Sequence, residues 1–424
     1  MNAVVIRPGP VSGSVHASPS KSYTHRALVI GHLSRREFRV EHPLDSEDTR
    51  ATAAALGRLG SPVVRGKTAW TVRPQRYRPS SMALRLDCRE SGTTLRFVSA
   101  LAALSDRTVL ISGSRRLSVR PVDELLSALS SLGAHCRHTS GSGFPIEIRG
   151  PIHGGRVSVD VSRSSQFASA LLLTLPTLHD DSTIELRGEV VSEPYLEATL
   201  AALSRHGVRI ARRGRRLRVP GPQRLLGSSF AVPGDASSAS YLWAAAAVGG
   251  GTARVLGIST SWPQADLAVL DLLESTGASV SRGPNGATVS EGPRRPFQFD
   301  LTNAPDLYPL AGVLAATSTG ESQITGAEHV VFKESDRRHQ TVRLARALGA
   351  RVHQGGGGLV IEGTARPRAL RLADLTDHRL VMSAAVAALA TDGPSVIGDA
   401  AAVRKSFPGF WLALKELSVE VKRR

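Results

Sequence analysis

The segment SPSKSYTHRALVIGH (18–32) places polar side chains that could bind an anion at the start of an expected helix. These side chains are Lys21, Ser22, His25 and Arg26. The apolar run 27–30 follows directly and continues the helix. Like charges at this spacing repel one another, so stability alone gives little reason for them. The segment therefore predicts that a phosphate or a carboxylate binds at this helix start.

Comparable helix starts recur along the chain. Hydroxylic or basic residues precede apolar runs in ESGTTLRF (90–97), SRSSQF (162–167), FKESDRR (332–338), DHRL (377–380) and VRKSFPGF (403–410). The free N–H groups and the dipole of a helix N-terminus attract anions. A single start of this kind is ordinary capping. Five or more, several with Arg or Lys, favour helices that converge on a multiply charged ligand.

These helices belong to a repeat that fills the chain. A phrase of apolar helix, glycine and strand occurs at 51–64, 124–137, 197–210, 267–280, 340–353 and, in degenerate form, 410–421. Its turn position is held by Gly60, Gly133, Gly207, Gly277, Gly349 and Ser418, which are 69 to 74 residues apart. Glycine there supplies the left-handed C-cap of a helix. Strand-like runs such as 156–161, 182–188 and 358–363 predict a small sheet packed against helices in each of six units. A boundary around 230–240 would divide the units three and three.

The composition restricts the class of protein. A chain of 424 residues with 41% hydrophobic residues is long enough for two globular domains. Two cysteines are too few for a disulfide framework, and the apolar runs are too short to span a bilayer. With no signal-peptide pattern at the N-terminus, a cytoplasmic protein without a membrane partner is expected. A net charge of +17 leaves polyanions, nucleic acids and phosphorylated metabolites open as partners.

Taken together, the motifs resemble those of the enolpyruvyl transferase family over essentially the full length. In the family's order they are SKSYTHRA, SGTTLRF, SRRLSVRP, SSQF, SEPY, GDASSASY, PDLYP, KESDR, DHR and KSFPGF. The resemblance implies an α/β fold, a two-domain inside-out α/β barrel in which each domain has three βαβαββ units. The first domain would comprise 1–20 plus 233–424, and the second 21–232, with helices directed toward a cleft.

The resemblance also implies a reaction. The enolpyruvyl group of phosphoenolpyruvate would pass to the 5-hydroxyl of shikimate 3-phosphate through a tetrahedral intermediate, with release of phosphate. This step belongs to the shikimate pathway, which leads to chorismate and the aromatic amino acids, and it is the target of glyphosate. The partners implied are these two small molecules, with no nucleic acid, and the chain is expected to be a monomer. No cofactor and no metal are expected, since no Cys/His cluster has ligand spacing.

By the same resemblance, each substrate has a set of binding residues. Shikimate 3-phosphate would be held by Lys21, Ser22, Arg26, Ser164, Ser165, Gln166, Ser192, Tyr195, Asp306 and Lys333. Phosphoenolpyruvate would be held by Lys21, Gly92, Arg116, Gln166, Arg337, Arg379 and Lys405. A site for two such substrates must concentrate positive charge and exclude water.

The catalytic residues implied are Asp306, Glu334 and Lys21. Asp306 would take the proton of the 5-hydroxyl, Glu334 would protonate C3 and later recover that proton, and Lys21 would assist. Cations near Glu334 would keep its carboxyl ionised, so desolvation must raise its proton affinity. His25 and His378 are expected to hydrogen-bond to the neighbouring arginines. Glu90 and His329 depart from the usual family pattern.

Two alternatives stay open. The related enzyme that acts on UDP-N-acetylglucosamine usually carries a reactive Cys five residues before an Arg-Pro pair, whereas Arg115 stands at that distance from Arg120-Pro121. A basic nucleic-acid-binding protein is compatible with the net charge. However, no helix-turn-helix, zinc-finger or RNA-binding signature is present, and aromatic residues do not interleave with the basic runs.

Overall fold

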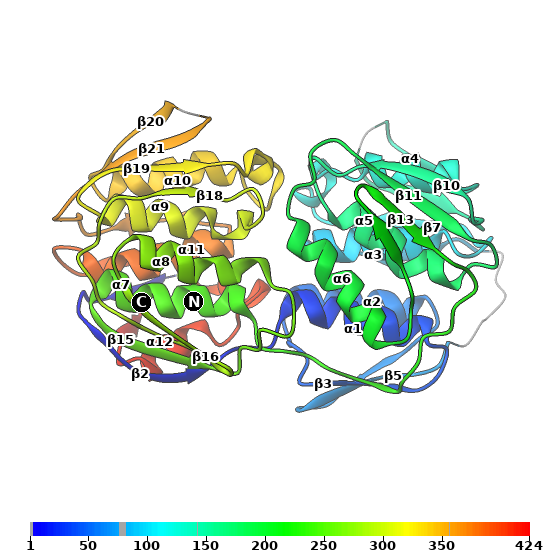
Figure 1. Cartoon of the computed structure of the whole chain (residues 1–424), viewed down its shortest axis with the longest axis horizontal. Helices are drawn as coiled ribbons and strands as arrows, with labels where there is room; N and C mark the ends of the chain where they lie inside the picture. Colours follow the sequence, from blue (N-terminus) through cyan, green and yellow to red (C-terminus); the bar gives the residue numbers. More distant parts are fainter. Residues whose placement is uncertain (1–2, 76–81, 142, 356) are drawn as a thin grey trace. The chain divides into compact units, whose positions relative to one another are not determined.

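The computed structural model describes residues 3–75, 82–141, 143–355 and 357–424 of the chain (Figure 1). The chain folds into two compact units. Unit 1 combines Met1–Ser20 with Pro233–Arg424, and unit 2 is Lys21–Val232. Unit 2 is therefore inserted between two segments of unit 1.

Unit 2 contains three four-stranded sheets within the described residues. The first has the order β14 (Ser229–Ala231), β3 (Phe38–Glu41), β5 (Ala69–Val72) and β4 (Val63–Arg65). The second has the order β6 (Leu84–Asp87), β7 (Val109–Ser112), β9 (Ile146–Arg149) and β8 (His135–His138). The third has the order β10 (Arg156–Asp160), β11 (Ser182–Arg187), β13 (Arg216–Val219) and β12 (Ala211–Arg213).

Unit 1 also contains three such sheets in its described part. One has the order β2 (Val11–His16), β15 (Gly251–Leu256), β17 (Gly286–Ser290) and β16 (Ser279–Gly283). Another has the order β18 (Gln298–Asp300), β19 (Gly320–Thr325), β21 (Gly358–Gly363) and β20 (Arg351–Gly355). The last has the order β22 (Arg371–Leu372), β23 (Ser395–Gly398), β1 (Ala3–Ile6) and β24 (Val421–Arg423).

All six sheets share one pattern of strand direction. The first two strands of each order are parallel, and the two that follow are each antiparallel to their neighbour. In the second sheet of unit 2, for example, Leu84 pairs with Val109 in parallel and Val109 pairs with Ile148 antiparallel. A parallel pair requires a crossover connection, which a helix supplies. The sixfold repeat predicted from the sequence is thus a repeat of topology.

Each repeat has one helix that is largely buried, and together these helices form the cores of the units. They are α1 (Lys21–Leu33), α3 (Gly92–Ala102), α5 (Gln166–Thr174), α7 (Ala236–Gly249), α9 (Tyr308–Thr317) and α11 (His378–Ala387). Every residue of α9 and of α11 is buried. Helices that are apolar on all sides occur in such positions. In the described ranges, no helix combines the length and hydropathy needed to cross a membrane.

A second helix in each repeat is only partly buried. These helices are α2 (Glu47–Arg58), α4 (Asp123–Ser131), α6 (Glu193–Arg205), α8 (Val269–Ser275), α10 (Arg337–Ala347) and α12 (Phe410–Glu416). The turn residue after each has positive φ, from 65° at Ser418 to 109° at Gly133. The predicted glycine turns are therefore confirmed, including the degenerate last copy. The next strand begins two to four residues later, which returns the chain to the edge of its sheet.

Candidate active site

The N-termini of the buried helices carry many of the residues singled out in the sequence. Lys21, Gly92 and Gln166 are the first residues of α1, α3 and α5 in unit 2. In unit 1, Asp306 lies in η4 (Pro305–Leu307), a 3₁₀ turn that leads into α9, and Arg379 is the second residue of α11. Unpaired backbone N–H groups at such termini already favour negative charge.

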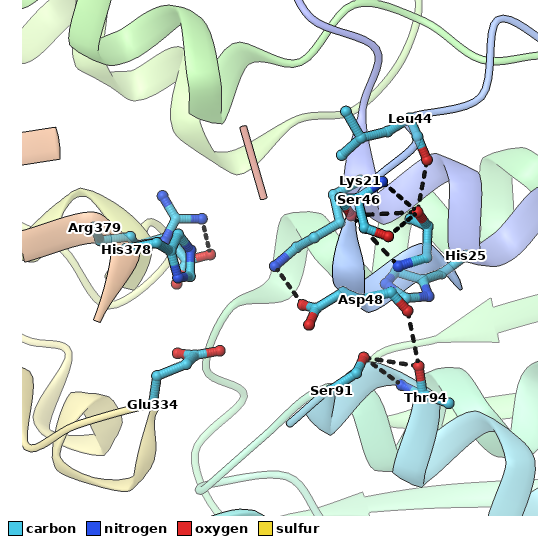
Figure 2. A network of polar contacts seen from close by, with 12 residues as sticks. Lys21, His25, Leu44, Ser46, Asp48, Ser91, Thr94, Glu334, His378 and Arg379 are labelled. Atoms are coloured by element: carbon cyan, nitrogen blue, oxygen red, sulfur yellow. Dashed lines mark hydrogen bonds and ion pairs between the residues drawn. The ribbon is translucent and has the colours of Figure 1, made fainter. Parts of the chain in front are cut away.

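Lys21 in unit 2 is held by a carboxylate that was not predicted from the sequence. Its Nζ lies 3.1 Å from Oδ2 of Asp48, whose side chain is buried (Figure 2). Asp48 stands in the first turn of α2, and a capping box between Ser46 and Thr49 fixes that turn. An ammonium group has three donors, so Lys21 can bind Asp48 and a substrate anion together.

His25 heads a chain of hydroxyl groups rather than contacting an arginine. Its Nδ1 lies 2.7 Å from Oγ1 of Thr52, Thr52 is 2.7 Å from Thr94, and Thr94 is 2.7 Å from Oγ of Ser91. Figure 2 shows His25, Ser91 and Thr94. Burial lowers the pKa of His25 to about 3, so the ring is neutral. The expectation that His25 bonds to an arginine is wrong, and so is the assumption that it adds to the charge repulsion at the start of α1.

Arg26 is buried and donates from all three guanidinium nitrogens. Nε donates to Oγ1 of Thr199 at 2.9 Å, Nη1 to the carbonyl of Ser22 at 3.0 Å and Nη2 to the carbonyl of Tyr195 at 2.7 Å. Burial lowers the pKa of Arg26 to about 10, which leaves the side chain charged at neutral pH. Arg26 thus joins α1 to α6 while contributing a positive charge.

Two loops of unit 2 bring together the predicted serines. Ser165 Oγ donates to the carbonyl of Ser192 at 3.1 Å, and Ser164 Oγ accepts from the backbone N–H of Gln166 at 3.2 Å. Ser192 has a φ of 57°, and its carbonyl also accepts from the N–H of Tyr195. The N-termini of α5 and α6 are therefore fixed to each other.

Gly92 is covered by Arg120, an arginine that was not among the predicted site residues. A Cβ atom at Gly92 would lie 2.7 Å from Cζ of Arg120. Arg120 is buried, with an exposed fraction of only 9%. The predicted Arg116 is exposed at the start of η1 (Leu117–Val119), although it has a polar interaction of its own. The Arg120-Pro121 pair was visible in the sequence, where it served only as a spacing marker. The geometry adds Arg120 to the candidate set.

Unit 1 contains a buried arginine surrounded by three carboxylates. Arg337 Nη1 donates to Asp306 at 2.7 Å, Nη2 to Glu334 at 2.6 Å and Nε to Asp377 at 3.0 Å. The side chains of Arg337 and Asp377 are 1% and 0% exposed. Asp377 also accepts from the backbone N–H of Arg379 and so caps α11. It was not among the predicted residues, although it stands in the quoted DHRL motif.

Asp306 is bound by two guanidinium groups. Its other oxygen accepts from Nη2 of Arg379 at 2.7 Å. Burial alone would raise the pKa of Asp306, but the charges of Arg379, Arg337 and Lys333 outweigh it and hold the pKa well below the usual value. Figure 2 shows Glu334, His378 and Arg379 of unit 1. The histidine expected beside an arginine, His378, lies 3.6 Å from Asp377.

The remaining predicted residues of unit 1 supply further charge. Lys405 ends η7 (Ala400–Lys405) and is 6% exposed. Lys333 is half-buried after η5 (Glu328–Phe332), and its charge acts on Asp306 and His329. Burial, followed by the Lys333 charge, lowers the pKa of His329 to about 3, so His329 is neutral.

The pKa of one buried carboxyl beside Asp306 is raised, and this residue was not predicted. Asp266 lies in η3 (Ala265–Ala268) and is 2% exposed. Burial and then the charge of Asp306 raise its pKa to about 6. Asp306 and Asp266 are thus neighbouring carboxyls whose proton affinities have moved apart. Pairs of this kind are typical of acid–base sites.

The arrangement fits proton transfer on an anionic substrate. Unit 1 holds carboxylates against guanidinium groups, while unit 2 presents an ammonium, guanidinium groups and serine hydroxyls. Among the described residues, no group of three or more His, Cys, Asp or Glu side chains is placed to hold a metal ion.

Comparisons of the sequence place it beside a well-populated family. The model of the family described as EPSP synthase (3-phosphoshikimate 1-carboxyvinyltransferase) matches residues 5–414. A protein of that second name from Thermococcus kodakarensis is 42% identical over 417 residues, or 98% of this chain and 100% of its own length. Another, from Methanocorpusculum labreanum, is 36% identical over 420 residues, or 99% of each chain.

The fold of the chain is the same as that of solved EPSP synthase structures. A solved EPSP synthase from Acinetobacter baumannii superposes with a TM-score of 0.81, covers 100% of both chains and is 24% identical in sequence. The predicted fold, a two-domain inside-out α/β barrel, is thereby confirmed.

Proposed function

The chain belongs to the EPSP synthase (3-phosphoshikimate 1-carboxyvinyltransferase) family, and we propose that the charged residues described above in its two units carry out that family's reaction. The reaction transfers the enolpyruvyl group of phosphoenolpyruvate to the 5-hydroxyl of shikimate 3-phosphate in the shikimate pathway. In this proposal units 1 and 2 are the two domains of the enzyme.

Unit 2 binds mainly through fixed donors. Shikimate 3-phosphate is assigned to Lys21, Ser22, Arg26, Ser164, Ser165, Gln166, Ser192 and Tyr195, together with Asp306 and Lys333 of unit 1. Phosphoenolpyruvate is assigned to Lys21, Gly92, Arg116 and Gln166, together with Arg337, Arg379 and Lys405 of unit 1. We add Arg120 to the second set, because its guanidinium lies against Gly92. Hydrogen bonds from charged donors are the strong ones for such anions.

The proton transfers are assigned to unit 1. Asp306 accepts the proton of the 5-hydroxyl as its oxygen attacks C2 of phosphoenolpyruvate, and Glu334 protonates C3 with help from Lys21. The tetrahedral intermediate then loses phosphate, and its C3 proton returns to Glu334. A base and an acid in these roles typically contribute about 10²–10⁴-fold each to the rate.

The ion pairs of Arg337 explain how one carboxylate can be held ionised and still exchange protons. In the structure Asp306 accepts a hydrogen bond from Nη1 of Arg337, and Glu334 accepts one from Nη2. A substrate anion that binds Arg337 or Arg379 must compete with these carboxylates. Losing a cationic partner raises the proton affinity of a carboxylate. A substrate anion that displaces Asp306 from Arg337 or Arg379 would therefore increase its ability to accept a proton.

The observation that carries the proposal is the sharing of Asp306 between Arg337 and Arg379 at 2.7 Å each. The test is a steady-state assay of phosphate release. Release must require both phosphoenolpyruvate and shikimate 3-phosphate. Release with UDP-N-acetylglucosamine in place of shikimate 3-phosphate would contradict the assignment, as would salt-sensitive nucleic-acid binding without turnover.

We further propose that the enzyme acts in the cytoplasm as a monomer. Both cysteines, Cys88 and Cys136, are free thiols, as a reducing compartment requires. Light scattering coupled to size-exclusion chromatography, with and without both substrates, tests the oligomeric state. A mass of twice 44.9 kDa would contradict the proposal.

A further inference from the structure

Arg96 is a buried arginine in a helix of unit 2. It lies in the second turn of α3 and is 3% exposed. Nη1 donates to Oε1 of Gln166 at 3.0 Å, while Nε and Nη2 donate to the carbonyl of Pro121 at 3.2 and 2.7 Å. Its Cζ lies 5.4 Å from the ring centre of Phe167, a cation–π distance. One guanidinium group therefore joins three segments of unit 2.

The contact with Gln166 fixes which way the amide points. A guanidinium has donors and no acceptor, so the amide atom facing Arg96 must be the oxygen. The Nε2 group of Gln166, with its two N–H donors, is then turned away from Arg96. Within the described residues no acceptor contacts it, and Gln166 is only half-buried. These donors stand at the N-terminus of α5, where an anion is favoured.

The contact with Pro121 fixes the neighbouring Arg120. Two hydrogen bonds hold the carbonyl that directly follows Arg120 in the chain. The Arg120 guanidinium lies over Gly92, the first residue of the helix that carries Arg96. Arg96 thus secures the backbone from which Arg120 projects.

We propose that Arg96 is a positioning residue, which orients the Gln166 amide and the Arg120 guanidinium toward phosphoenolpyruvate without touching the substrate itself. This inference rests on the proposed function, since it concerns the binding of that reaction's substrate. It predicts that both side chains act through N–H donors on a carboxylate or phosphate oxygen.

Arg96→Lys is the direct test. Lysine keeps the charge but cannot reach Gln166 and Pro121 together, because it lacks the planar fork of donors. The KM for phosphoenolpyruvate should rise about 10-fold or more, the size expected for one charge-assisted hydrogen bond. The kcat should change less than about threefold, because ground-state binding is what is lost. Equal falls in kcat and kcat/KM would overturn the inference.

A double-mutant cycle separates positioning from general disruption. In the Gln166→Ala background, Arg96→Lys should raise the KM by clearly less than it does in the wild type, because part of its effect passes through Gln166. Full additivity would contradict the inference. Arg149→Lys is the matched control, since Arg149 Nε also donates to a backbone carbonyl, that of Asp106. It should leave both kinetic constants unchanged.

A second pair of variants tests the amide orientation if Arg96→Lys does not fold. Gln166→Glu keeps an oxygen acceptor for Arg96 but presents a carboxylate to the substrate, whereas Gln166→Met removes both amide groups. The inference requires a larger KM for phosphoenolpyruvate in Gln166→Glu, and equal values would overturn it. Wild-type turnover with both substrates shows separately whether the proposed function holds.

Discussion

The two units treat their buried cations differently. In unit 2, Arg26 and Arg96 donate to hydroxyl, amide and backbone carbonyl oxygens, while Lys21 pairs with a carboxylate. In unit 1, Arg337 and Arg379 are bound by acidic side chains. The neutral partners of Arg26 do not offset its positive charge, which suits the capture of anions. In unit 1 the partners are carboxylates, whose proton affinity depends on the nearby cations. This arrangement suits acid–base chemistry. Changes in unit 1 should therefore affect turnover, and changes in unit 2 should affect binding.

Asp306→Ala should give the largest effect. Loss of the base lowers kcat by about 10²–10⁴-fold. Shikimate 3-phosphate should still bind within about 10-fold, because the donors of unit 2 remain. Phosphate release gives the rate, and calorimetry gives the affinity. Unchanged turnover would contradict the role of Asp306 and remove the contrast between the units.

Arg120→Ala should have the second-largest effect, and this effect should be on substrate binding. We expect the KM for phosphoenolpyruvate to rise about 10- to 100-fold, since hydrogen bonds to charged groups contribute about 1.5–3 kcal/mol. Arg116→Ala is the matched variant: an arginine four residues earlier, exposed instead of buried. Its effect on KM should be smaller. If Arg116→Ala has the larger effect, the sequence-based choice was right and the inference from burial was wrong.

Gly92→Ala should raise the KM for phosphoenolpyruvate by a smaller factor than Arg120→Ala does. The added methyl group would lie 2.7 Å from Cζ of Arg120, so the guanidinium must move. The guanidinium is the far end of a flexible side chain, so a shift of Arg120 accommodates the methyl without unfolding α3. We expect a severalfold rise in the KM for phosphoenolpyruvate and little change in melting temperature. An effect that persists undiminished in the Arg120→Ala background would show that Gly92 acts independently of Arg120.

The smallest effect concerns acid stability in unit 2. The folded-state pKa of His25 is about 3, below its usual 6.5, so the unfolded chain binds an extra proton between these values. Stability is complete above pH 6.5 and is lost as the pH falls toward 3. His25 should contribute about 2 kcal/mol of the loss between pH 7.5 and 5. Urea unfolding at these two pH values should show a smaller loss for His25→Gln, whereas the exposed His179→Gln should match the wild type.

Local patterns in the sequence were enough to predict the repeats. The turn at Gly133 and its counterparts follows from helix periodicity and a positive φ, both of which are properties of a few adjacent residues. Partners that come from distant segments could not be found this way. Asp48 is 27 residues from Lys21, Asp377 is 40 from Arg337, and Thr199 is 173 from Arg26.

The burial of individual side chains was the second property that could not be predicted from the sequence. Arg116 and Arg120 are equally basic in sequence, and only packing against Gly92 distinguishes them. His25 looked like part of a charged cluster, and only its burial makes it neutral. The resemblance of motifs supplied most of the candidate site residues, but it could not say which of their donors were already occupied by other groups of the protein.

The insertion of unit 2 also sets an order of events during synthesis. Strand β2 must wait for β15, which lies some 240 residues further along the chain, and β1 pairs with β23 and β24 near the C-terminus. Unit 2, by contrast, is one continuous segment that leaves the ribosome whole before most of unit 1 exists. Domains that emerge first generally fold first. Strands β1 and β2 are thus translated before unit 2 and yet find their partners after it, so the nascent chain must keep these two strands from aggregating in the meantime.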